Sequence, residues 1–534
     1  MTEPAPAGRP ETATRETTRV PQRTRRLFIA VACLTFAVYL VSARGLPTTF
    51  DEQIVFDTTG ALVHAKPTID TPLLRAFPGL SVRRSDGRRA GIYGIGTSVV
   101  GVPFYLVGKA VAQVSPASKR PQVVLTATMF TDALITAATV LVLMLLCFLL
   151  GAAPPGAVLV GLSYGLGSYA YPHAITLFTE PGTALCVLAA AFFAIRAARG
   201  ARRVDLVLCG VWAGAALLFR ISAALFLPIF GLWLLIAAAL ARDGRRVDAR
   251  RIVEFGGWFT AGAFGPLLLL ALANWWRYGS PTNLGYALGS ARQSYPILRG
   301  LAGQWISSGK SLFIFAPVAV VVVLGLGITL RKLPIEMCLL GALVLANTLF
   351  FARVQFWSGD WAWGPRYMQI VLPCLAAMAA PLMNRRVWRQ ALVCLSIFGL
   401  VFVALPAVLV RFRLIFAAAA HTMPPASISG PPNWDHSYYA LIWHTLHWQQ
   451  VLYQLRLLPH AVANSLNHVT NRFGPTPVTR PPGLPRIEFW WLRSRDIGWP
   501  AAIFFALWPV AAAVAGVRML KGALSSPASV PVEP

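Results

Sequence analysis

Apolar runs of about 20 residues recur along this chain and constrain its fold more than any other feature. A helix needs about 20 residues to cross the roughly 30 Å of hydrocarbon in a bilayer. We count about twelve such runs, each long enough to span a membrane or nearly so. With a mean hydropathy of +0.60 and only 13% charged residues, the chain lies outside the range of soluble globular domains. The sequence therefore predicts an all-α polytopic membrane protein.

The predicted transmembrane helices are separated by loops of very uneven length. In order, the helices are Leu27–Ala43, Gln122–Leu150, Gly156–Ile175, Pro181–Ala198, Val204–Phe219, Ser222–Ala241, Ile252–Ala273, Ser311–Leu330, Ile335–Phe351, Met368–Met383, Ala391–Val410 and Trp499–Val517. The stretch Gly94–Val114 is also apolar. We expect it to be an interfacial or re-entrant helix in the first external loop, residues 44–121, because a thirteenth span would reverse the orientation of every later loop.

Arginine and lysine gather in short segments between the predicted spans. These segments are Arg19–Arg26, Arg196–Arg203, Arg242–Arg251, Arg331-Lys332, Arg385–Arg389 and Arg518–Lys521. Twelve spans place all of them on one side, and a Lys/Arg excess marks the cytoplasmic side. We therefore expect a plasma-membrane protein with both termini in the cytoplasm.

This orientation divides the chain into a core and its appendages. We expect a disordered N-terminus (1–26), a transmembrane core (27–410), a large last external loop or small subdomain (411–498), a last span (499–517) and a cytoplasmic tail (518–534). The net charge of +27 is typical of proteins that bind polyanions, but the apolar background favours anionic membrane lipids over nucleic acid. Nucleic acid is therefore not an expected partner.

Acidic residues are scarce, with 20 Asp and Glu in 534 residues, and two of them stand together after the first span. Thr49-Phe50-Asp51-Glu52 matches a capping box, in which Thr49 and Glu52 close the start of a helix. This structural interpretation leaves Asp51 free to face a cavity. A carboxylate at the membrane face is also suited to act as a general base. Asp51 and Glu52 are therefore candidate catalytic residues.

A third external acid, Glu180, precedes Pro181 at the predicted start of a helix. One interpretation is that Glu180 complements the positive end of the helix dipole. The other is that it converges with Asp51 on the acceptor or on a divalent metal ion. Both stay open, and no cofactor is otherwise indicated.

The densest motif is Trp357–Tyr367, which combines tryptophans, turn-forming residues and charges just before a predicted span. Its candidate residues are Trp357, Asp360, Trp361, Trp363 and Arg366. An aromatic belt at the interface accounts for the tryptophans without any function. Alternatively, tryptophan faces bind sugar rings, and Arg366 with nearby Arg353 is suited to hold a phosphate. A glycine cluster around Tyr93, Gly91–Gly96, offers backbone amides and a hydroxyl to the same phosphate.

Together these motifs give the chain a family likeness. It resembles the GT-C superfamily of integral-membrane glycosyltransferases, especially the protein-mannosyltransferase-like and aminoarabinose-transferase-like members. The likeness lies in Asp51-Glu52 in the first external loop, the interfacial helix after it, Glu180, and the motif Trp357–Tyr367. It covers about the first 380 residues.

The resemblance implies transfer of a sugar from a polyprenyl-phosphate-linked donor to a cell-envelope glycan, lipid or protein on the extracytoplasmic face. It implies that Asp51 is the general base, with Glu52 and Glu180 as supporting or metal-binding acids. Arg366, Arg353 and Tyr93 would bind the donor phosphate.

Three alternatives remain at this stage. A secondary transporter or flippase also has about twelve spans with both ends inside, although it usually shows related halves and ionisable groups at mid-membrane. A polysaccharide ligase or polymerase would use arginine and histidine residues of the last external loop. A scaffold without catalytic activity would use none of these residues.

Overall fold

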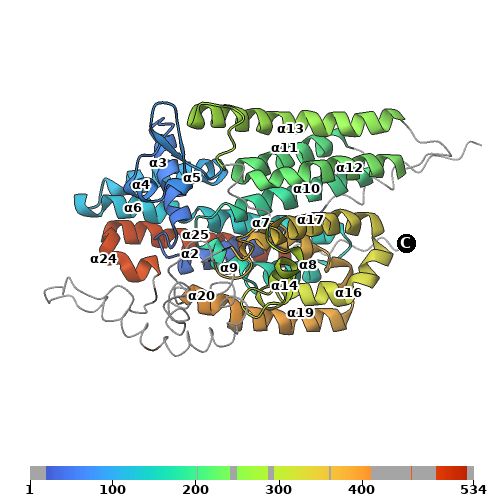
Figure 1. Ribbon diagram of the computed structural model, residues 1–534. Coiled ribbons are helices and arrows are strands. Elements are labelled where there is room, and N and C mark those ends of the chain that lie inside the picture. The colour runs from blue at the N-terminus through green and yellow to red at the C-terminus, as the bar shows by residue number, and fades with distance from the viewer. Residues whose placement is uncertain are drawn as a thin grey trace, which may run out of the picture.

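Long helices that run side by side form most of the protein (Figure 1). The computed structural model describes residues 20–525 apart from 201, 241–248, 287–293, 360–361, 410–458, 460–486 and 488. In these residues the β-structure is one antiparallel hairpin, β1 (Ser81–Arg83) with β2 (Arg89–Gly91), in which Val82 faces Ala90. The prediction of an all-α polytopic membrane protein is confirmed. Of the expected last external loop, 411–498, the structure describes residues 459, 487 and 489–498, which include η8 (Trp490–Arg493) and α24 (Ser494–Ile497).

Eight stretches of the described chain are helical, long and apolar enough to cross a membrane. They are α2 (Gln22–Ser42); η2 (Ala117–Lys119) with α6 (Arg120–Thr128) and α7 (Thr131–Leu149); α10 (Glu180–Gly200); η3 (Ile221–Leu225) with α12 (Phe226–Leu240); α13 (Ala249–Tyr278); α17 (Pro334–Ala352); α19 (Arg386–Phe398) with η6 (Gly399–Ala404) and α20 (Leu405–Leu409); and α25 (Trp499–Ser525). Each coincides with a predicted span.

The other four predicted spans are helical but short or interrupted. They are α8 (Pro154–Gly165) with α9 (Ala170–Ala174); α11 (Arg203–Phe219); α15 (Leu312–Phe315) with α16 (Val318–Lys332); and η4 (Arg366–Ile370) with α18 (Leu372–Ala377) and η5 (Ala380–Leu382). Proline contributes to the breaks, because it lacks an N–H and cannot continue a helix from the preceding turn. At two of the breaks the free backbone groups pair with each other, since the Tyr169 amide donates to the Phe315 carbonyl at 2.9 Å.

Arginine side chains join the ends of several helices at one end of the bundle. At one end, Arg199 at the end of α10 pairs with Glu336 at the start of α17 at 2.7 Å and donates to the carbonyl of Leu149 at the end of α7. Arg26 of α2 donates to the carbonyl of Gly522 of α25 at 3.3 Å. The Lys/Arg bias predicts that Arg199 and its neighbours face the cytoplasm.

At the other end lie the hairpin, α3 (Phe50–Val63), α4 (Pro72–Ala76) and α5 (Gly96–Ala112) (Figure 1). The apolar helix α5 packs against α3 and α6. Gly108 permits its close approach to α6, because a Cβ at this position would lie 2.8 Å from the Val124 Cα. α5 corresponds to the predicted interfacial or re-entrant helix Gly94–Val114.

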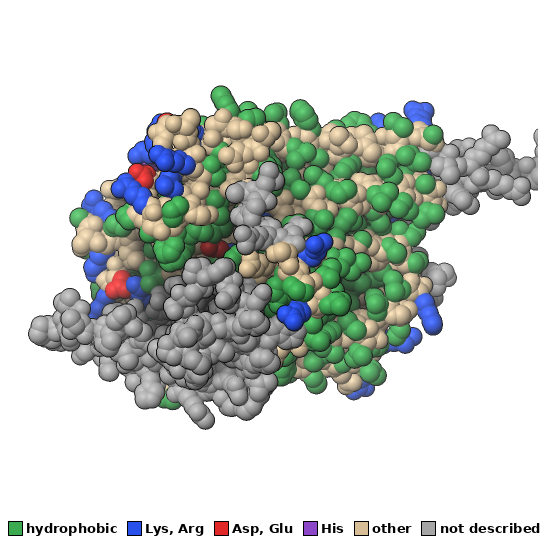
Figure 2. Space-filling model, in the orientation of Figure 1, with side chains coloured by type: hydrophobic (Ala, Val, Ile, Leu, Met, Phe, Trp, Pro, Cys, Tyr) green, Lys and Arg blue, Asp and Glu red, His purple; other side chains and the backbone are tan. Residues whose placement is uncertain are grey.

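Apolar side chains cover the sides of the bundle, whereas Lys and Arg gather toward its ends (Figure 2). α13 is the clearest case, with Val253 73% and Phe264 65% exposed. Such a surface is costly in water and favourable against lipid chains. It supports the assignment of a multi-pass membrane protein.

Asp57 on α3 allows a test, by pH, of the end of the bundle that contains the hairpin, α3, α4 and α5. Burial raises the pKa of Asp57 to about 6, although Gln53 donates to its carboxylate at 2.9 Å. Between the ordinary pKa of an aspartate and about pH 6, Asp57 is protonated in the folded state but ionised in the unfolded chain. The free energy of unfolding therefore falls as the pH rises through this window. Asp57→Asn should raise the unfolding free energy at pH 7.5 by up to about 3 kcal/mol, which is the free energy that corresponds to a pKa raised from 3.8 to about 6.

The measurement is thermal unfolding of the detergent-solubilised protein at pH 3.5 and pH 7.5. The variant and the wild type should unfold at the same temperature at the lower pH. An equal gain at both pH values would show that the carboxylate charge is not the cause.

Candidate active site

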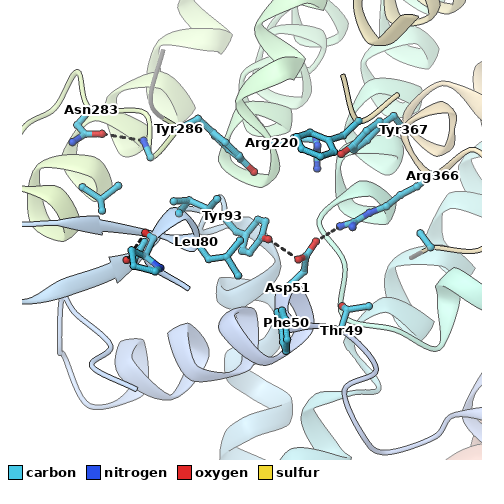
Figure 3. Close-up of a pocket in the computed structure, with 18 residues that line it drawn as sticks. Thr49, Phe50, Asp51, Leu80, Tyr93, Arg220, Asn283, Tyr286, Arg366 and Tyr367 are labelled. Carbon is cyan, nitrogen blue, oxygen red and sulfur yellow. Dashed lines mark hydrogen bonds and ion pairs between the residues drawn. The ribbon is translucent and has the colours of Figure 1, made fainter. Parts of the chain in front are cut away.

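A cavity of about 790 Å³ opens between residues 44–121, the predicted first external loop, and the residues around Arg366. This volume is within the usual range for small-molecule sites. Its walls come from distant parts of the chain: Thr49–Asp51, Pro78–Val82, Ile92, Tyr93, Arg220, Asn283, Gly285, Tyr286, Phe356, Ala362, Arg366 and Tyr367. Figure 3 shows Asp51 between Tyr93 and Arg366.

At the start of α3, Asp51 and Glu52 have different surroundings, as the capping box predicts. The side chain of Glu52 accepts the Thr49 amide at 2.9 Å and the Thr48 hydroxyl at 2.9 Å. Glu52 is fully buried, and this burial raises its pKa, while the hydrogen bonds from Thr48 and Thr49 lower it. Asp51 points into the cavity instead. Glu52 thus holds the helix that presents Asp51.

Both carboxylate oxygens of Asp51 have a partner. Oδ1 accepts the Tyr93 hydroxyl at 2.6 Å, and Oδ2 lies 2.7 Å from Nη2 of Arg366 (Figure 3). The pKa of Tyr93 is well above its usual value because burial and the adjacent Asp51 disfavour the phenolate. Tyr93 therefore remains a neutral hydrogen-bond donor.

Glu180, the first residue of α10, lies behind this cavity and does not line it. It is fully buried, and its Oε1 lies 2.8 Å from both Arg366 Nε and Arg220 Nη1. One carboxylate thus holds two guanidinium groups that do line the cavity. This geometry gives Glu180 a positioning contact rather than a contact with bound substrate.

The guanidinium group of Arg366 also stacks on an aromatic ring. Its guanidinium carbon lies 3.9 Å from the centroid of the Phe178 ring, a cation–π contact. The Phe178 amide donates to the carboxylate of Asp132 at 2.7 Å, and Asp132 is fully buried. Asp132 of α7 thus anchors the segment that ends in Glu180.

Sequence reasoning missed two arginines. Arg220 follows α11, pairs with Glu180, and lies 4.8 Å from the centroid of the Tyr367 ring. The signal was available, because Arg220 is the single charged residue between positions 206 and 241 and lies on the predicted outer side. Arg277 donates to the carbonyls of Tyr93 at 2.9 Å and Gly91 at 2.6 Å, so it fixes the backbone that carries Tyr93.

The remaining predicted residues occupy other places. Trp357 and Trp363 are buried in the protein and do not line the cavity, and the Trp363 indole donates to the Val403 carbonyl at 2.9 Å. Arg353 is exposed and also outside the lining. Asp360 and Trp361 lie outside the described residues. From the motif Trp357–Tyr367, the cavity is lined by Ala362, Arg366 and Tyr367.

A divalent metal between Asp51 and Glu180 does not fit this arrangement. The guanidinium of Arg366 contacts both carboxylates and fills the space between them. Across the described ranges, no group of three His, Cys, Asp or Glu side chains lies close enough to hold a metal ion. We therefore derive no step through a metal.

No family model and no curated protein match the chain, but it is similar to several solved structures, among them the following two. ArnT from Cupriavidus metallidurans is 15% identical, with a TM-score of 0.48, over 92% of this chain and 76% of that chain. An oligosaccharyltransferase from Archaeoglobus fulgidus, in complex with zinc and sulfate, is 12% identical, with a TM-score of 0.38, over 78% of this chain and 57% of that chain. Because both TM-scores are below 0.5, the residue roles below rest on this chain's own geometry.

Asp132 provides a test of how the arginine site is supported. Asp132→Ala leaves the buried Phe178 amide without its acceptor, which should cost about 1–3 kcal/mol of unfolding free energy. Asp132→Asn keeps an acceptor oxygen and should lose much less. Thermal unfolding in detergent measures both, and equal losses would show that the hydrogen bond to Phe178 is not what matters.

Proposed function

We propose that this protein is a membrane glycosyltransferase that transfers a sugar from a polyprenyl-phosphate-linked donor to a cell-envelope acceptor on the extracytoplasmic face. The observation that supports this most is the cavity in which Asp51 lies beside Arg366 and Arg220. It combines a carboxylate for the acceptor proton with two cations for a leaving phosphate.

The reaction uses these groups as follows. The bond between the anomeric carbon and the phosphate oxygen breaks, and its electron pair leaves with the lipid phosphate. The acceptor hydroxyl oxygen bonds to the anomeric carbon, and its proton passes to Asp51. Arg366 and Arg220 stabilise the phosphate, whose negative charge grows by one as the bond breaks.

The cavity wall also suits an amphipathic donor. Besides the arginines, the cavity is lined by the apolar side chains of Phe50, Leu80, Val82 and Ile92, all from the predicted first external loop. Tyr93, Tyr286 and Asn283 add hydrogen-bonding groups suited to sugar hydroxyls. An anionic head with an apolar tail therefore matches this cavity better than a fully hydrophilic solute.

The position of the charged groups favours an enzyme over a transporter. Asp51 lies at the start of α3, Glu180 at the start of α10 and Arg366 at the start of η4, so the site forms where elements begin, at the end of the bundle that contains the hairpin. A transporter site is expected near mid-membrane. The ligase alternative depends on the predicted last external loop, most of which lies outside the described residues.

Asp51→Asn tests the proposed reaction. It keeps the size of the side chain but removes the base, so we expect transfer to fall by about 10²–10⁴-fold with normal abundance in the membrane. In cells whose own gene is deleted, the variant should fail to clear the lipid-linked sugar that accumulates. Mass spectrometry of the lipid extract measures this.

The matched control is Asp70→Asn, a change at an exposed acid of the same external loop that pairs with Arg75 outside the cavity. It should restore normal lipid-linked sugar levels. Full clearance by Asp51→Asn would remove the proposed role of Asp51, and no accumulation in the deletion strain would remove the proposed donor.

A further inference from the structure

Arg366 is shared by two carboxylates that differ in their freedom to move. Glu180 is fully buried and contacts Arg366 through Nε at 2.8 Å and Nη2 at 3.3 Å, while also pairing with Arg220. The Asp51 side chain is 22% exposed, faces the cavity and contacts Arg366 through Nη2 at 2.7 Å. The pair with Glu180 is therefore an anchor, and the pair with Asp51 is exchangeable.

In this arrangement Asp51 is not ready to act as a base. Tyr93 occupies Oδ1 and Arg366 occupies Oδ2. The ion pair with Arg366 is a charge-assisted bond of the strong kind. An acceptor hydroxyl can deliver its proton to Oδ2 only after this bond has been loosened.

Charge balance indicates what loosens it. Two guanidinium groups, Arg220 and Arg366, are balanced by two carboxylates, Asp51 and Glu180. A phosphate that enters beside them adds negative charge, and like charges in a partly buried site repel strongly. Glu180 is fully buried and has no space into which its carboxylate could move, whereas the carboxylate of Asp51 can turn into the cavity.

We propose that the donor phosphate displaces Asp51 from Nη2 of Arg366, and that this exchange frees Asp51 to accept the acceptor proton. The proposal rests on the proposed function and adds a binding order to it. The donor binds first, because only its phosphate releases the base. Glu180 is then a positioning residue that keeps Arg366 in place throughout the exchange.

This proposal makes predictions of opposite sign for the two acids. The probe is farnesyl phosphate, a short polyprenyl monophosphate without a sugar, binding to the purified full-length protein in nanodiscs. Asp51→Asn removes the competing charge and should bind the probe about 10-fold more tightly, the effect of about 1.4 kcal/mol. Glu180→Gln removes the anchor and should bind it at least about 10-fold more weakly. Isothermal titration calorimetry measures both dissociation constants.

Two controls separate this exchange from simpler effects. Asp70→Asn should bind the probe like the wild type, because Asp70 pairs with Arg75 outside the cavity. Farnesol, which has no phosphate, should bind the wild type and Asp51→Asn equally. Tighter binding of farnesol by Asp51→Asn would attribute the gain to the apolar wall and overturn the exchange.

Unchanged or weaker binding of farnesyl phosphate by Asp51→Asn would also overturn the exchange. That result leaves the proposed function standing if the same variant still loses sugar transfer. Should Glu180→Gln fail to fold, the Asp51→Asn measurement alone decides, and Asp51→Ala repeats it with a smaller side chain. Both Asp51 variants must tighten binding of the phosphate probe for the proposal to hold.

Discussion

The ion cluster around Glu180 is the interaction on which the rest of the site depends. Its carboxylate is fully buried and pairs with Arg220 and Arg366, each at 2.8 Å. Burying an ion costs several kcal/mol, and this cost is offset only where geometry and further hydrogen bonds are favourable. The cluster joins the start of α10, the end of α11 and the start of η4, so it also fixes how these elements meet.

Breaks in the transmembrane helices provide the room for this cluster. Arg220 lies between α11 and η3, and Arg366 follows the turns at Gly359 and Gly364. Both glycines have positive φ, 73° and 69°. A side chain at Gly359 would place its Cβ 2.5 Å from the Cβ of Arg366. The backbone around Arg366 is buried in the protein and contributes to the cavity lining.

The contacts of a site residue could be predicted when its partners are close in the sequence, and could not when they are distant. The division of labour between Asp51 and Glu52 was predictable, because a capping box is made within four consecutive residues. Glu180 was singled out by its position, but its contacts depend on arginines 40 and 186 residues away in sequence. The burial of Trp363 against Val403 was not predictable either, because this contact is also distant in sequence. Tryptophan occurs both in interfacial belts and in buried cores, so the residue type does not distinguish the two.

The sequence by itself determined that the chain crosses a membrane repeatedly, where most spans lie, that an apolar helix follows the first acidic pair, and that α3 begins with a cap. These follow from hydropathy, length and hydrogen bonds between near neighbours. Only the tertiary structure decided which charges meet. It placed Glu180 behind the arginines, brought Arg220 to the cavity, left Arg353 outside it, and set Arg366 between two acids. A low-dielectric interior makes such pairs strong, but which residues enter it depends on helix packing across the whole chain.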